Sequence, residues 1–414
     1  MQLFTVLFIL ALALSTGVSL WLAQRQIGHV KTRRGSVPEE FSERISLQAH
    51  QRAADYTVAR VGFGRITLLW TLVVTLAWTL GGGLQLLDDA VRSFELSPVL
   101  TGTAVLVAFV IIGGLIELPF EYWQTFRIEQ RFGFNRSTVG LFFLDKIKGT
   151  LVALVLGLPL AWIVVYLMES AGSLWWLWVW AVWFGFSLFL SWAWPAFIAP
   201  LFNTFSPLSD ESLKTRIDAL LERCGFRSQG VFIMDGSRRS AHGNAYFTGF
   251  GRNKRIVFFD TLLEGLTARE VEAVLAHELG HFRLKHIRNR LAVMAALSLA
   301  ALALLGWLAQ QPWFYTALGL ERASSHGALL LFMLAGPAFG FFLSPLMAAY
   351  SRRHEFQADD FAARQTEAEA LVDALVKLYE ENANTLTPDP MYSAFNDSHP
   401  PAPIRIAHLR GSPA

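Results

Sequence analysis

The chain has 414 residues, of which 53% are hydrophobic and only 16% are charged. With a mean hydropathy of +0.38, this composition excludes an ordinary soluble protein and predicts a mostly α-helical, polytopic membrane protein whose partner is the lipid bilayer. The net charge of +2 provides no general basic field, so we expect no nucleic-acid partner. The sole cysteine, Cys224, excludes an internal disulfide and a thiolate metal cluster.

Seven apolar segments without charged residues are each long enough to cross about 30 Å of hydrocarbon as a helix. They are residues 3–23, 66–87, 97–116, 150–168, 174–194, 291–309 and 328–348. The first segment resembles a signal peptide in length, but basic residues follow it and none precedes it, which predicts a retained span. We therefore expect seven transmembrane helices.

The basic residues between these segments predict the orientation of the chain. Eight lysines and arginines lie between the first and second segments, one between the second and third, five between the third and fourth, and none between the fourth and fifth. Residues 195–290 are also strongly basic, whereas the connection between the last two segments contains only Arg322. Because short cytoplasmic loops are enriched in lysine and arginine, we expect the N-terminus outside, and residues 195–290 and the C-terminus in the cytoplasm.

Residues 195–290 are less apolar and are predicted to form a soluble insertion between the fifth and sixth membrane helices. Helical spacing of leucine and isoleucine predicts a helix at 211–224. Three short strands are expected at 231–234, 245–250 and 255–259, with a turn at 251–253. Thr267 and Glu270 match a capping box that begins a further helix, and we expect this helix to continue directly into the sixth span.

This last helix contains the sequence AHELGHFRLKH at residues 276–286. His277 and His281 lie four residues apart, so their imidazoles emerge on one face of the helix and can bind one metal ion. This is the HExxH spacing of zinc metallopeptidases, whose catalytic sites normally have three protein ligands and a water. Glu278 can act as the general base that takes a proton from the water and later delivers it to the leaving nitrogen. The alternative is a chance occurrence of the motif.

Residues 244–247 are a candidate edge strand beside this helix. A metalloprotease commonly holds its substrate extended against an exposed strand, where backbone hydrogen bonds recognise the peptide before its side chains do. Asn244, Ala245 and Tyr246 are therefore candidate substrate-binding residues. The alternative is a small sheet that only supports the helix.

Two positions are candidates for the third metal ligand. His286 is close in sequence, but Leu284 and Ile287 stand where the longer metzincin pattern requires glycine and histidine, so we expect His286 to be interfacial. Glu355 and Asp359 follow the seventh span and share one face of a predicted helix that continues to about residue 378. One carboxylate can bind the metal while the other accepts a hydrogen bond from a ligating histidine. The alternative is a solvated acidic face.

Several motifs together resemble the Ste24 family of CAAX prenyl proteases, which are membrane metallopeptidases of the M48 class. They are HELGH at 277–281, ExxAD at 355–359, NAYFTGFG at 244–251, SHPP at 398–401 followed by Arg405, LPF at 118–120 and TFRIEQRFGFN at 125–135. The resemblance implies seven transmembrane helices that enclose a water-filled chamber, with a small α+β zinc metallopeptidase domain on the cytoplasmic side. The compact chain suggests a bacterial member, in the cytoplasmic membrane.

The resemblance also implies roles for individual residues. It makes His277, His281 and Glu355 the ligands of one zinc ion, and it makes Glu278 the general base. Asp359 would orient a ligating histidine, and Asn244 would touch the substrate.

The C-terminal tail is implied to complete the active site. His399 and Arg405 would lie near the scissile carbonyl, where hydrogen-bond donors and cations stabilise a developing oxyanion. Ile404 stands where the family often has glutamate, which leaves the pairing around Arg405 less defined. Without the resemblance, residues 398–403 would be an ordinary polar loop.

We therefore expect a zinc-dependent, integral-membrane endopeptidase whose substrate is a prenylated or otherwise membrane-associated polypeptide. Its expected parts are five transmembrane helices (1–194), a zinc peptidase insertion (195–290), two further transmembrane helices (291–348) and a C-terminal helical part (349–414). One alternative is an HtpX-like quality-control protease of membrane or misfolded proteins, which would have fewer spans. The other is a non-catalytic chamber protein that binds or moves a hydrophobic ligand with structural zinc, which would not need Glu278 as a base.

Overall fold

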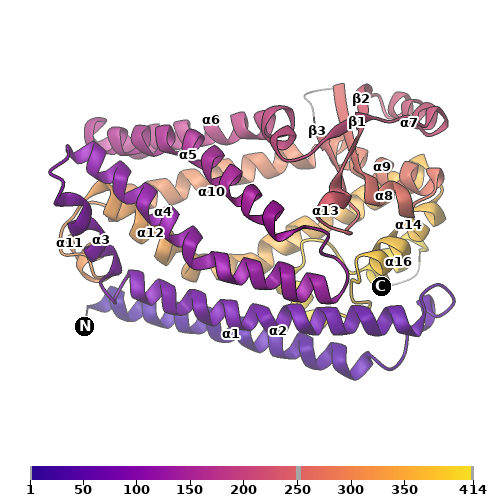
Figure 1. Ribbon diagram of the computed structural model, residues 1–414, viewed down its shortest axis with the longest axis horizontal. Helices are drawn as coiled ribbons and strands as arrows, with labels where there is room; N and C mark the ends of the chain where they lie inside the picture. The colour runs from indigo at the N-terminus through magenta and orange to yellow at the C-terminus, as the bar shows by residue number, and fades with distance from the viewer. Residues whose placement is uncertain (1, 249–252, 412–414) are drawn as a thin grey trace.

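The computed structural model describes residues 2–248 and 253–411, and it combines long helices with one small sheet (Figure 1). Within these residues, seven helical segments are long and apolar enough to cross a membrane, as the sequence predicted. They are α1 (Leu3–Arg33), α2 (Leu47–Trp78), α4 (Pro98–Trp123) with the turn Gln124–Glu129, α5 (Val139–Ser170), α6 (Trp175–Ala193) with its flanking turns, α10 (His286–Leu308), and α12 (Ser325–Gly340) joined to α13 (Ser344–Gln365).

The other elements are shorter and belong mainly to the region that carries the sheet. They are α3 (Gly83–Arg92), α7 (Glu211–Arg223), α8 (Asp260–Gly265), α9 (Ala268–Arg283), α11 (Pro312–Thr316), α14 (Ala368–Glu381), α15 (Pro390–Asn396), α16 (Ala402–Leu409), and strands β1 (Phe205–Pro207), β2 (Arg227–Met234), β3 (Ala245–Thr248) and β4 (Asn253–Phe259).

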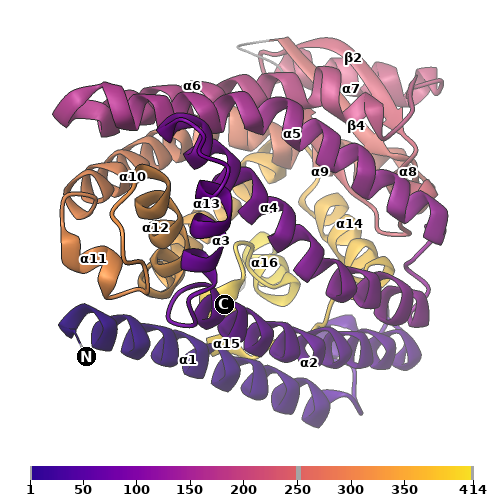
Figure 2. The same cartoon turned by 60° about the vertical axis from the view of Figure 1, so that its left-hand side comes forward.

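The spanning helices bury only a small share of their side chains within the structure. In Figures 1 and 2, α1 and α2 lie opposite α5 and α6 across the molecule. A helix in a packed bundle buries a continuous apolar stripe, but the 32-residue helix α5 buries only Phe142, Val164 and Val165. Most side chains of the spans are therefore exposed, and one cluster of buried apolar side chains joins α1, α4, α5, α6, α10 and α12.

The predicted second span, 66–87, is wrong in its bounds. Helix α2 begins at Leu47 and ends at Trp78, and α3 begins at Gly83. The turn depends on glycine, because Gly82 has φ +77° and a Cβ on Gly81 would lie 2.9 Å from the backbone of Ala77. The apolar sequence continues through this turn, so composition alone did not reveal it.

Two predicted helix continuities are also wrong. Helix α9 ends at Arg283, and Lys285, with φ +63°, separates it from α10. The helix after the seventh span ends at Gln365, and the extended backbone of Thr366 separates it from α14. In both places the helical spacing of apolar residues continues across the break, so the sequence pattern did not reveal where the helix ends.

The sheet has the strand order β1-β2-β4-β3, so β3 lies at an edge, as predicted for residues 244–247. Strand β3 pairs antiparallel with β4, whereas β2 and β4 are parallel. The short strand β1 was not predicted, because three residues carry too little pattern. The ends of the predicted strand 245–250 and turn 251–253 include residues 249–252, which lie outside the described residues.

One apolar core unites the sheet, α7, α9 and α14. Leu275, Ala276 and Leu279 of α9 are completely buried in it, and the predicted capping box of Thr267 and Glu270 begins this helix. Phe41 and Ile45, from the loop between α1 and α2, belong to the same core. The soluble region is therefore packed against the membrane region rather than tethered to it.

Asp389 fastens the C-terminal segment to the first membrane helix. Its side chain is 3% exposed and accepts hydrogen bonds from Nε and Nη2 of Arg25 at 3.2 and 2.9 Å. The same carboxylate caps α15 by accepting from the backbone N–H groups of Met391 and Tyr392. Its own N–H donates to Gln26 at 2.6 Å. A single carboxylate thus organises the approach to the C-terminal tail.

We expect Asp389→Ala to lower the free energy of unfolding by about 2 to 3 kcal/mol, because it removes a helix cap and two charge-assisted hydrogen bonds. Thermal unfolding of the purified chain in detergent measures this loss. Asp373→Ala, which removes an exposed carboxylate paired with Arg44, is the control and should change stability little. An unchanged melting temperature for Asp389→Ala would contradict the role of Asp389.

The stability should also depend on pH through Asp389. Burial raises the pKa of its carboxyl, but the hydrogen bonds from Arg25 and Tyr392 outweigh burial and hold the pKa below the usual 3.8. The stabilisation is therefore present above that value and is lost as the pH falls through the lower pKa of the folded chain. Melting curves of the parent and of Asp389→Asn, measured from about pH 6 to about pH 3, should converge at the acid end.

Candidate metal centre and active site

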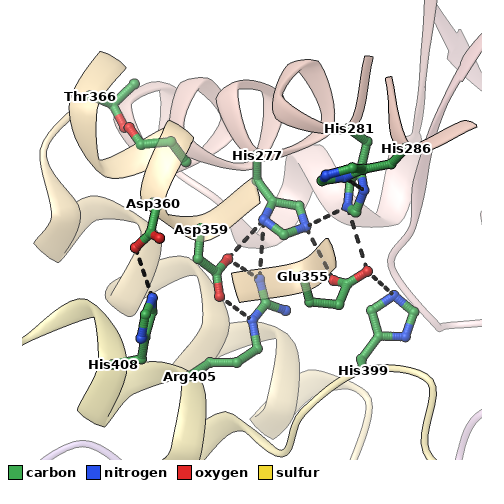
Figure 3. A network of polar contacts seen from close by, with 11 residues as sticks. His277, His281, His286, Glu355, Asp359, Asp360, Thr366, His399, Arg405 and His408 are labelled. Atoms are coloured by element: carbon green, nitrogen blue, oxygen red, sulfur yellow. Dashed lines mark hydrogen bonds and ion pairs between the residues drawn. The ribbon is translucent and has the colours of Figure 1, made fainter. Parts of the chain in front are cut away.

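Three side chains from two helices converge at one point (Figure 3). Nε2 of His277 and Nε2 of His281, both on α9, lie 3.2 Å apart. The carboxylate of Glu355 on α13 places Oε2 3.4 Å from the first nitrogen and Oε1 3.5 Å from the second. The family resemblance implied these three residues as metal ligands, and the structure brings them together.

The donor set fits a metal ion. Oε2 of Glu355 is buried and has no hydrogen-bond partner within the described residues. The two imidazole nitrogens face the same point, where a cation between the three groups would offset their mutual repulsion. Two imidazoles and one carboxylate are a common set for catalytic zinc.

Each imidazole is oriented by a partner on its other nitrogen. Nδ1 of His277 lies 2.8 Å from Oδ1 of Asp359, so it carries the proton and leaves Nε2 free for a metal. Nδ1 of His281 lies 3.1 Å from Nδ1 of His286, whose Nε2 lies 3.0 Å from Oε1 of Gln357. Nε2 of His286 can only donate to the glutamine oxygen, so Nδ1 of the neutral His286 ring accepts a hydrogen bond from Nδ1 of His281. Nε2 of His281 is therefore free for a metal, and this assignment follows from the hydrogen-bond network.

His286 was expected only at the membrane interface, and the structure adds a contact with the metal ligand His281. The side chain of His286 is buried, with the residue 3% exposed, and its ring stacks on His354 with centroids 4.0 Å apart. Neither His286 nor Gln357 was assigned a role from the sequence. The break at Lys285, which no sequence pattern indicated, turns His286 back towards His281.

The close approach of α9 and α13 depends on small residues. A Cβ on Gly280 would lie 3.1 Å from Cα of Ala358 and 3.2 Å from Cβ of Phe361. Such distances are tighter than ordinary packing allows. The glycine of HELGH and the alanine of ExxAD thus allow the two helices to meet at the metal cluster.

Arg405 on α16 lies behind His277. Its Nε and Nη2 donate to the two oxygens of Asp359, and Nη2 lies 3.3 Å from Nδ1 of His277. Arg405 is 8% exposed and Asp359 is completely buried. The sequence placed Arg405 near the scissile carbonyl; its observed contacts are on the Asp359 side, and Nη1 makes no hydrogen bond to any described residue.

His399 and Glu278 flank the cluster. Nε2 of His399 lies 3.5 Å from Oε1 of Glu355, and 64% of its side chain is exposed. Glu278 is partly exposed and makes no hydrogen bond or ion pair within the described residues. Burial raises the pKa of Glu278 above its usual range. The structure therefore brings Glu278 and His399, two of the three predicted catalytic residues, to the metal cluster.

The edge strand lies beside the end of the metal helix. The rings of Phe247 on β3 and Phe282 on α9 have centroids 6.4 Å apart. Ala245 and Tyr246 pair with β4, and Asn244 is exposed at the start of the strand. Asn244 also lines a cavity of about 890 Å³ between the sheet and the membrane helices.

A group of polar contacts that the sequence did not predict connects the segment before this strand to the membrane helices. The hydroxyl of Tyr56 donates to Glu129, with distances of 2.7 and 2.9 Å to its two oxygens, and Nε2 of His242 lies 3.5 Å from the same carboxylate. Phe134 stacks on His242 with centroids 4.2 Å apart. The TFRIEQRFGFN motif indicated this segment without indicating its partners.

Comparisons with known proteins agree with the fold and the site. Residues 26–204 match the family described as CAAX prenyl protease N-terminal, five membrane helices, and residues 207–412 match peptidase family M48. The CAAX prenyl protease 1 homolog of Caenorhabditis elegans is 31% identical over 435 residues, covering 98% of this chain and 97% of the relative.

Two further proteins extend the comparison. CAAX prenyl protease 1 of Saccharomyces cerevisiae is 30% identical over 421 residues, covering 94% of this chain and 91% of the relative. The crystal structure of S. mikatae Ste24p superposes with a TM-score of 0.92 at 27% identity and covers 99% of both chains. Neither the HtpX-like nor the non-catalytic alternative is favoured by these matches. The chain belongs to peptidase family M48 and is a membrane metalloendopeptidase of the CAAX prenyl protease 1, or Ste24, group.

Proposed function

We propose that this chain is a zinc-dependent protease of CAAX-type peptides, with one zinc ion held by His277, His281 and Glu355. The observation that carries the proposal is the convergence of these three donors beside Glu278, whose carboxylate makes no hydrogen bond within the described residues. When bound, zinc supplies a Lewis acid that polarises the peptide carbonyl and acidifies a water molecule.

The side chains around the metal would then transfer protons and stabilise the negative charge that develops on the substrate. Glu278 accepts a proton from the attacking water and delivers it to the leaving amine. His399 is exposed at the rim of the cluster, where it donates a hydrogen bond to the developing oxyanion. Nη1 of Arg405 is the part of that side chain available for the same task.

Asp359 and His286 act through the ligands. Asp359 holds His277 in the tautomer that binds metal, and Arg405 holds Asp359. His286 does the same for His281, with Gln357 as its own partner. Such partners usually contribute substantially to metal affinity.

The peptide would bind along β3, with Asn244, Ala245 and Tyr246 as the contacting residues. The outer side of an edge strand offers unpaired backbone groups for an extended peptide. The relatives' names indicate prenylated CAAX substrates. The distribution of basic residues favours a site on the cytoplasmic side and an N-terminus outside, which we include in the proposal. The bacterial source and the four-part division of the chain also stay predictions.

Glu278→Gln should lower the rate of peptide cleavage at least about a hundredfold, because the amide cannot accept the proton of the attacking water. Metal content, measured by atomic emission, should match the parent, since Glu278 is not a ligand. Glu264→Gln, an exposed carboxylate outside the site, is the control and should cleave normally. Cleavage by Glu278→Gln at the parental rate would exclude this mechanism.

His286→Phe should weaken zinc binding about 10- to 100-fold, because it removes the partner of Nδ1 of His281 while keeping a ring to stack on His354. Competition with a chromophoric chelator measures the dissociation constant of the metal. His408→Phe removes a histidine that contacts Asp360 instead and serves as the control. Equal zinc affinity in His286→Phe and the parent would refute the orienting role.

A farnesylated CAAX peptide should be cleaved with a higher kcat/KM than the same peptide without the lipid, because the lipid adds apolar area that the exposed apolar side chains of the spans can cover. Cleavage assays with both peptides, and with Glu278→Gln as the blank, measure the ratio. Equal rates would exclude prenyl specificity but not the peptidase. Cleavage of neither peptide would contradict the proposed function.

A further inference from the structure

A second pocket lies next to the metal centre and is used by none of the proposed catalytic steps. Its volume is about 410 Å³, and it lies between the start of α10 and the outer part of α13. His286 and Gln357, the two residues that support His281, form part of its wall. The rest of the wall includes Arg353, His354, Asp360 and Arg364 of α13, and Leu284 and Asn289 near the start of α10.

The pocket has unpaired positive charge. Arg353 and Arg364 are exposed, and neither forms an ion pair with any described residue. Several arginines of the soluble region are paired, namely Arg44 with Glu369 and Asp373, Arg216 and Arg223 with Glu272, Arg269 with Glu367, and Arg410 with Glu369. Arg288 and Arg290 on α10, like the two pocket arginines, form no ion pair with a described residue. The one carboxylate that lines the pocket, Asp360, lies 2.8 Å from Nε2 of His408. The two pocket arginines are thus left for a ligand.

The wall also offers uncharged hydrogen-bond donors. His354 is 6% exposed, and its ring makes no hydrogen bond within the described residues; Nδ1 is enclosed, which leaves Nε2 for a ligand. Asn289 is exposed on the first turn of α10. This helix begins at His286 without a side-chain cap, so its first backbone N–H groups add positive potential at the same end. Cationic and neutral donors around one cavity suit an anion with several oxygens, such as a phosphate group.

The position of the pocket indicates where such a phosphate comes from. Helix α10 is the sixth candidate span, and the pocket lies at the first turn of this helix, at one end of the span. Leu284 and Ile287 beside the pocket are 38% and 43% exposed. Exposed apolar residues next to basic ones are typical of the level of the lipid head groups.

We propose that this pocket binds the phosphate head group of an anionic phospholipid, with Arg353 and Arg364 as its charged ligands. The planar guanidinium groups can donate paired hydrogen bonds to phosphate oxygens. The acyl chains would continue past Leu284 and Ile287 into the bilayer. The inference does not depend on the identity of the peptide substrate, because it uses no residue of the substrate strand or general base.

The test uses the full-length chain in detergent, with dihexanoyl phosphatidylglycerol, dihexanoyl phosphatidylcholine and inorganic phosphate as separate probes in isothermal titration calorimetry. The parent should bind the anionic lipid about tenfold more tightly than the zwitterionic one. The double variant Arg353→Gln/Arg364→Gln should lose about tenfold or more in affinity for the anionic lipid. The charge-matched control Lys214→Gln/Arg269→Gln, which removes two ion-paired surface cations, should bind like the parent.

The outcomes separate the possible occupants. Selective binding that is lost only in the double variant supports the lipid site. Inorganic phosphate that binds as tightly as the anionic lipid and displaces it would overturn the lipid assignment in favour of a soluble phosphate compound. Equal affinity for both lipids, or equal affinity in the parent and the double variant, would overturn the site itself. An unchanged metal content of both double variants verifies that they are folded.

Discussion

The close crossing of α9 and α13 is the constraint on which the site depends. Neither helix carries a complete metal site, since α9 supplies two imidazoles and α13 supplies the carboxylate. Gly280 faces the backbone of Ala358 so closely that a Cβ there would lie 3.1 Å from Cα of Ala358. A bulkier residue there would force the helices apart, so the packing of two backbones decides whether three ligands share one ion.

This crossing also joins the chemistry to the membrane. Helix α13 continues the seventh span, and α10, the sixth span, follows α9 after a two-residue break. Helix α13 is thus part of a candidate span, and α9 is followed directly by one. Phe41 and Ile45, from the loop between α1 and α2, also pack into the core of the soluble region. The metal cluster thus lies at the junction of the soluble region and the membrane helices.

Two polar chains keep the imidazoles oriented on either side of this junction. One runs from His277 through Asp359 to Arg405, and it brings the C-terminal helix α16 to the site. A buried ion pair of this kind adds little net stability, but losing one partner leaves an uncompensated charge. The other chain runs from His281 through His286 to Gln357, which also forms the wall of the basic pocket. The same two side chains, His286 and Gln357, therefore line the pocket and orient the metal ligand His281.

The sequence by itself determined the class of protein and most of the chemistry. Long apolar segments have few alternatives to membrane helices, and the four-residue spacings of His277 with His281 and Glu355 with Asp359 place each pair on one helical face. Only the tertiary structure decided which of these faces meet, because Gly280 and Ala358 are seventy-eight positions apart in the chain. The bounds of the second span, the position of His286 and the contacts of Arg405 also came from the fold. They depend on turns at Gly82 and Lys285 and on long-range contacts, which local spacing does not encode.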